Sequence, residues 1–223
     1  MDWTLAIKRN RDQLKDIVLA LFVIAKMRVG GSLFTLPRST LAAIKLVLRP
    51  AESAVRRLIV IAAHGLAPLS SPRLRGEVPG IAGRRGDLPI KAFKLFDPLK
   101  SFDPESIWDN DQVTYESGFG LVASASQSHD TSLDHQPIDA TQIGQRLNAL
   151  MRALENLPRQ ARRLIRWQAK RDAALMAHRP TRMSPMRPGL PPGWRERKVH
   201  EIDTVLRECH GLAHDLLNAP DTS

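Results

Sequence analysis

The sequence predicts an all-α protein, a small helical assembly with a long irregular, disordered middle segment and at most one short β-hairpin. Apolar residues recur at helical spacing in residues 1–66 and again in residues 139–218, which we expect to pack together. The stretch between them, 67–138, is rich in proline and glycine and then in aspartate and serine. Of the 223 residues, 43% are hydrophobic but only 5% are aromatic, so a core would be mainly aliphatic.

Three helices are expected in the N-terminal region, at about 4–27, 40–49 and 51–64. The first contains a run of nine apolar residues, 17–25, which includes Phe22. A membrane-spanning helix needs about 20 such residues, so a buried or interfacial helix is favoured over a spanning segment or a cleaved signal. Pro50 is placed in the first turn of the third helix, where its missing N–H costs nothing.

Basic residues border these apolar helices. Arg56 and Arg57 lie beside the apolar stripe of the third helix, and Lys15 and Lys26 flank the apolar run. The helices could pack in a core, or they could lie against a membrane. In the second case Phe22, Arg56 and Arg57 would be the contacts with anionic lipid or with a partner.

The middle region carries two features of interest. The tripeptide Phe-Asp-Pro occurs at 96–98 and again at 102–104, and it could dock on a partner, fold back onto its own domain or form two turns. The segment 118–123 fits the pattern G-x-G-x-x-A, but no strand–helix unit surrounds it, so a dinucleotide site is rejected. A short hairpin pairing about 112–116 with 119–123 is expected instead.

The C-terminal region begins with a helix that Asp139 and Gln142 would cap and that Pro158 interrupts. The continuation is strongly basic, and four of its cations recur at steps of four, three and four, so they share one helix face. This is the clearest candidate for binding a polyanion. The candidate residues are Arg159, Arg162, Arg163, Arg166, Lys170 and Arg171.

The distribution of charge along the chain is consistent with several partners for this basic helix face. The net charge of +10 divides into +7 for residues 1–66, +4 for 67–100, −8 for 101–143 and +7 for 144–223. The face could hold nucleic acid without sequence preference, anionic lipid or an acidic protein. It could equally be solvated, or it could pair with the acidic segment 101–143 of the same chain.

The remaining C-terminal sequence predicts a proline-rich strap and a last helix. Residues 178–194 contain five prolines and must be extended, either across the helices or on a partner. A helix at about 200–217 would pack through a coiled-coil-like seam that includes Cys209, which is expected to be a buried thiol. His210 and His214 lie one turn apart, and we expect them to be a polar flank rather than a metal site.

No catalytic signature is present in the sequence. It contains no G-x-S-x-G, no P-loop and no Cys-x-x-Cys, so we expect neither an enzyme nor a bound cofactor or metal.

Four stretches of the sequence resemble an uncharacterised alphaproteobacterial protein family with no assigned function. The resemblance covers both ends of the chain and little of the middle. It implies a bacterial protein that is cytoplasmic or lies near the inner membrane, and it carries no activity or site residues. The stretches are MDWTLAIKRNRDQL, TLPRSTLAAIKLVLRPAESAVRRLIVIAA, LFDPLKSF and SPMRPGLPPGWRERKVHEIDTVLRECHGLAHDLL.

The expected function is therefore that of a non-enzymatic membrane-proximal or adaptor protein, cytoplasmic or peripheral on the inner membrane. The alternative is a sequence-independent nucleic-acid-binding protein that uses the basic helix.

Overall fold

The computed structural model describes residues 3–66, 92–98 and 137–218, and it confirms the all-α class. The described residues form five helices and one two-stranded antiparallel sheet. The elements are α1 (Trp3–Ile24), β1 (Thr35–Pro37), α2 (Arg38–His64), β2 (Pro137–Asp139), α4 (Thr141–Glu155), α5 (Leu157–Met176) and α6 (Glu201–Asn218). The hairpin expected at 112–123 lies outside the described residues.

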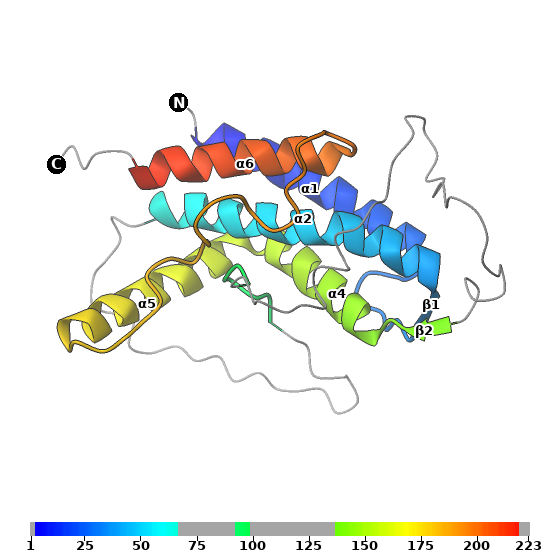
Figure 1. Ribbon diagram of the computed structural model, residues 1–223, viewed down its shortest axis with the longest axis horizontal. Coiled ribbons are helices and arrows are strands. Elements are labelled where there is room, and N and C mark those ends of the chain that lie inside the picture. The colour runs from blue at the N-terminus through cyan, green and yellow to red at the C-terminus, as the bar shows by residue number, and fades with distance from the viewer. Residues whose placement is uncertain (1–2, 67–91, 99–136, 219–223) are drawn as a thin grey trace.

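Helix α2 lies in the middle of the assembly. Figure 1 shows α1 and α6 along one side of it and α4 along the other, while α5 projects at one end of the long axis. From Ser53 to Ile61 every residue of α2 is buried, because neighbouring helices, residues 92–98 and the segment that contains Pro192 cover this part of α2 together. The core is mainly aliphatic, as the composition predicts.

Two predicted helices, 40–49 and 51–64, are one continuous helix in the structure, so the expected break at Pro50 is wrong. A proline inside a helix leaves the carbonyl four residues earlier without its usual donor. Here that carbonyl, at Leu46, accepts a hydrogen bond from the guanidinium of Arg195. Gly193 (φ +82°) lies so close that a Cβ atom there would be 2.7 Å from the Pro50 nitrogen. Arg195, the residue after the strap, thus supplies the hydrogen-bond donor that Pro50 lacks.

The two strands join the segment between α1 and α2 to the start of α4. Thr35 lies opposite Asp139, and Leu36 opposite Ile138. Asp139 accepts hydrogen bonds from the backbone N–H (2.9 Å) and the hydroxyl (2.6 Å) of Thr141. These bonds lower the pKa of Asp139. Asp139 is therefore bonded to the first residue of α4, but the N-cap position is occupied by Ala140 without a side-chain bond, so the prediction of Asp139 as the cap is wrong.

The last helix packs as predicted. Its seam of apolar residues is buried against the rest of the core, and Cys209 is fully buried in it. Burial raises the pKa of the Cys209 thiol to about 12, so the thiol is a core group and not a nucleophile. No helix within the described ranges has the length and apolar character needed to span a bilayer.

Candidate polyanion site and buried arginine network

Helix α5 presents an uninterrupted basic surface to solvent. On a projection of about 100° per residue, five of its cations fall within an arc of about 100°, and this arc lies opposite the buried Leu157, Ala161 and Leu164. All five side chains are in exposed positions. We call them the basic face: Arg159, Arg162, Arg163, Arg166 and Lys170.

The sixth predicted cation, Arg171, is not part of this face. Its guanidinium donates to the carbonyl of Met183 (2.7 Å) and pairs with Asp172 (2.7 Å). It also lies 5.6 Å from the ring centre of Trp167. Arg171 therefore holds the strap against α5, and its prediction as a polyanion contact is not supported by this geometry.

Within the described parts of the chain, no carboxylate pairs with any residue of the basic face. Arg163 donates to the carbonyl of Phe93 (2.8 Å), and Arg166 donates to that of Arg162 (3.4 Å). Desolvation, and then the charge of Arg166, lower the pKa of Arg163. Of the acidic segment 101–143, the predicted internal partner, only residues 137–143 belong to the described parts of the chain.

The predicted contacts with lipid or a partner, Phe22, Arg56 and Arg57, are buried instead. Phe22 is 3% exposed, Arg56 6% and Arg57 0%. Phe22 packs in the core because α1 turns the opposite face to solvent. The two arginines are buried because a carboxylate from a distant part of the chain lies between them. The expectation that they form an outer surface is corrected.

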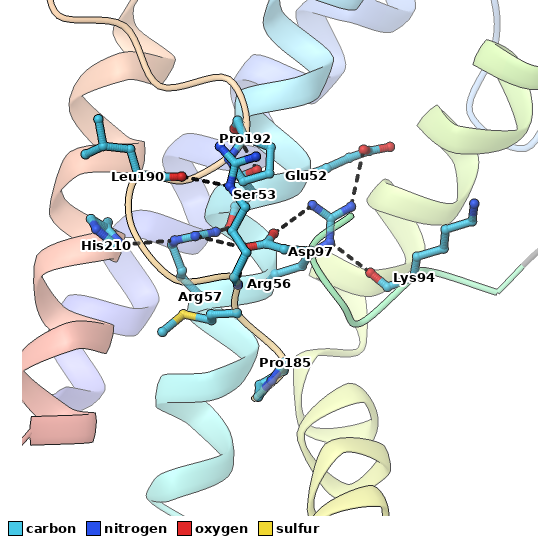
Figure 2. A network of polar contacts seen from close by, with 12 residues as sticks. Glu52, Ser53, Arg56, Arg57, Lys94, Asp97, Pro185, Leu190, Pro192 and His210 are labelled. Carbon is cyan, nitrogen blue, oxygen red and sulfur yellow. Dashed lines mark hydrogen bonds and ion pairs between the residues drawn. The ribbon is translucent and has the colours of Figure 1, made fainter. Parts of the chain in front are cut away.

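That carboxylate belongs to Asp97, which is 1% exposed. Its Oδ2 is 2.9 Å from Nη2 of Arg57, and its Oδ1 is 3.3 Å from Nη1 of Arg56 (Figure 2). Burial lowers the pKa of Arg57, while Asp97 acts in the opposite direction. Buried ions need such pairing, since an isolated charge in the interior is very costly.

Further groups complete this network. Arg57 donates through Nη1 to the carbonyl of Ser53 (2.8 Å) and through Nε to Nδ1 of His210 (3.2 Å). On the other side, Glu52 pairs with Arg56 (3.4 Å) and with Arg146 of α4 (2.8 Å). The network therefore joins α2, α4 and α6 with residues 92–98.

Sequence reasoning singled out the Phe-Asp-Pro tripeptide but not the role of its aspartate. The tripeptide at 96–98 folds back onto its own domain, which is one of the three arrangements that the sequence allows. Phe96 packs edge-on against Trp167, with ring centres 4.9 Å apart. The available signal was the pair of adjacent arginines on a helix whose neighbouring residues are apolar.

His210 of α6 and His200, the residue just before α6, form hydrogen bonds within the protein itself. His210 Nδ1 accepts from Arg57, and His200 Nδ1 accepts from the backbone N–H of Ile202 (3.1 Å). Asp203 accepts from the backbone of His200 (3.0 Å) and from Arg195 (3.3 Å). In the described ranges no three histidine, cysteine or acidic side chains are grouped so as to hold a metal ion.

These histidine contacts predict that the protein loses stability at acid pH. Desolvation is the main cause that lowers the pKa of both His200 and His210, and for His210 the charge of Arg57 adds to it. The unfolded chain then binds more protons, so stability is full above pH of about 6.5 and falls as the pH decreases below it. The measurement is the melting temperature between pH 5 and 8.

Between pH 5 and 8, the melting temperature of the double variant His200→Gln with His210→Gln should depend less on pH than that of the native chain. Glutamine can still accept a hydrogen bond but does not titrate. His178→Gln, an exposed position after α5, is the matched control and should leave the slope unchanged. Equal slopes for all three proteins would contradict the assignment.

A second surface differs in character from the basic face. At the C-terminal end of α1 and in the loop that follows, large apolar side chains are exposed, among them Val23 (77%) and Phe34 (65%). Residues 17–51 contain no acidic residue, although Asp139 lies across the sheet from Thr35. We call this surface the α1 tip. It comprises Leu19, Val23, Ile24, Val29 and Phe34, with the exposed cations Lys26, Arg28 and Arg38.

Comparison of the chain with family models, with curated proteins and with solved structures found no match to any of them.

Proposed function

We propose that the protein is a non-enzymatic, sequence-independent nucleic-acid-binding protein, and that the basic face of α5 contacts the phosphate backbone. The observation that carries this proposal is the composition of the face. Its five cations cluster opposite the buried side of a projecting helix, with no acidic partner among the described residues. Arginine and lysine in this arrangement neutralise phosphates and release counterions.

The neighbouring residues of the helix favour nucleic acid over lipid at this site. Interfacial membrane helices insert large apolar side chains beside their cations. On α5 the solvent-facing positions within and beside the basic arc include Ala169 and Ala173, which are small and cannot insert, and the exposed Leu175 and Met176 come after the last cation of the face. From Arg159 to Lys170 the helix rises about 16 Å, a length over which a duplex presents more phosphate charges than the face has cations.

The basic face offers only charge and hydrogen-bond donors, so binding would not depend on base sequence. The test is a salt titration of binding to random-sequence DNA and RNA, in duplex and single-stranded form. If all five cations engage phosphates of a duplex, the logarithm of the affinity falls with the logarithm of salt with a slope of about −4 to −5. Absence of binding at 50 mM salt would contradict the proposal.

The α1 tip supports a second candidate function, peripheral association with an anionic membrane. Exposed Val23 and Phe34 could enter the interface while Lys26 and Arg28 meet head groups. We expect the native chain to float with anionic liposomes at low salt, and Val23→Asp with Phe34→Asp to abolish flotation. A native chain that stays entirely in the soluble fraction would exclude this candidate.

The two candidates are separable because α5 projects at one end of the long axis and the α1 tip lies toward the other (Figure 1). Charge changes on α5 should therefore affect nucleic-acid binding, and changes at the α1 tip should affect flotation.

A further inference from the structure

Residues 93–98 lie on the helices as a bound peptide would. Figure 2 shows Asp97 inserted between α2 and the strap, with the residues before it passing toward α4 and α5. We call the surface beneath this segment the peptide slot. It is formed by Arg56, Arg57, Arg163, Trp167, Arg182 and Pro185.

Much of the recognition in the slot is of the main chain. The carbonyl of Phe93 accepts from Arg163 (2.8 Å), and that of Lys94 accepts from Nε of Arg56 (3.1 Å). The backbone N–H of Asp97 donates to the carbonyl of Pro185 (2.9 Å). These bonds would form with any segment of the same backbone shape, as in other extended-peptide sites.

Side-chain recognition centres on two positions. The carboxylate of Asp97 meets two buried guanidinium groups, and the ring of Phe96 lies between Trp167 and the guanidinium of Arg182 (5.1 Å). Two positions before Asp97, Leu95 is buried, and so is Phe93. Lys94 and Pro98 are exposed. In the order of residues 93 to 97, the slot therefore selects an apolar residue, any residue, a second apolar residue, phenylalanine and aspartate.

The chain carries this hexapeptide twice in succession. Residues 93–98 read Phe-Lys-Leu-Phe-Asp-Pro, and residues 99–104 read Leu-Lys-Ser-Phe-Asp-Pro. The phenylalanine and aspartate that the slot selects are identical in the two copies. The first position is apolar in both, and the one unfavourable difference is Ser101 where the first copy has the buried Leu95.

We propose that the peptide slot is a docking site for this hexapeptide, and that residues 99–104 occupy it in a second register when residues 93–98 leave. The chain length permits the exchange, since 32 residues would still connect residue 104 to β2 at Pro137. At about 3.3 Å per residue they could reach about 100 Å. Ser101 fills the Leu95 position poorly, so the first register is preferred, which agrees with the structure.

The test is a double-mutant cycle on the full chain with Asp97→Asn, Asp103→Asn and both together. If the second copy replaces the first, Asp103→Asn alone leaves the melting temperature unchanged and Asp97→Asn lowers it moderately. The melting temperature of the double variant then falls further than the sum of the two single effects, by at least about 5 °C, or the double variant fails to fold. Additive effects, including an Asp97→Asn variant as unstable as the double variant, would overturn the proposal.

A peptide experiment tests the slot directly. The capped peptide Leu-Lys-Ser-Phe-Asp-Pro should raise the melting temperature of the double variant, in proportion to the logarithm of its concentration above its dissociation constant. The matched peptide with asparagine in place of aspartate should not. An equal response to both peptides, or no response to either, would overturn the assignment of the slot.

Discussion

Arg57→Met is expected to lower the free energy of unfolding by about 3 kcal/mol, because removing one partner of a buried ion pair leaves the other charge poorly compensated. Methionine fills much of the same volume, so the loss reports the polar contacts rather than a cavity. Asp97 would keep only the longer contacts, with Arg56 (3.3 Å) and with the backbone N–H of Arg187 (3.4 Å), and His210 would lose its donor Arg57. For a chain of this size the melting temperature should fall by about 6–12 °C.

The matched control for this variant is Arg162→Met, which replaces an exposed arginine that has no carboxylate partner among the described residues. Arg162→Met should change the free energy of unfolding by no more than about 0.5 kcal/mol. Chemical denaturation followed by circular dichroism measures both variants. If Arg57→Met unfolds at the same denaturant concentration as the native chain, the network of Figure 2 does not stabilise the fold.

Replacing Arg162, Arg166 and Lys170 with glutamate is expected to weaken nucleic-acid binding by about 100-fold or more at low salt. Three phosphate contacts are lost and three repulsive charges are added, so the salt slope for a duplex should decrease by about 2.7 or more. Arg163 is left in place because it holds the carbonyl of Phe93, and its loss would disturb the peptide slot as well.

The control for the charge reversal replaces three other cations with glutamate, namely Lys8, Lys45 and Arg49, which are exposed on α1 and α2. Both triple variants change the net charge equally, so a general loss of positive charge cannot explain a difference between them. Equal affinity of the two variants for random-sequence nucleic acid would show that the basic face of α5 is not the binding site. Circular dichroism establishes that both remain helical.

The sequence predicts those parts of the fold that local patterns determine. The break between α4 and α5 follows from Pro158, and the seam that buries Cys209 follows from its helical spacing. The continuity of α2 could not be predicted, because the group that satisfies the Leu46 carbonyl is 149 residues away. The short strands β1 and β2 were missed for the same reason, since each is three residues long and its partner is distant.

The candidate site also combines features that local patterns determine with features that depend on distant residues. The basic face of α5 depends on periodicity within one helix, so sequence alone identifies it. The burial of Arg56 and Arg57 depends on Asp97, about 40 residues later, and no local pattern distinguishes an arginine with such a partner from an exposed one. Charge and hydropathy are properties of segments, whereas ion pairing is a property of the assembled chain.

The bond between Arg195 and the Leu46 carbonyl also has a consequence for biosynthesis. Residue 46 leaves the ribosome long before residue 195, and at about 5–20 residues per second the interval is roughly 7–30 s. During that time the apolar sides of α1 and α2 that later pack against α6 have no cover. High contact order of this kind slows folding and exposes nascent chains to aggregation, so we expect the chain to depend on chaperones until its last helix has been made.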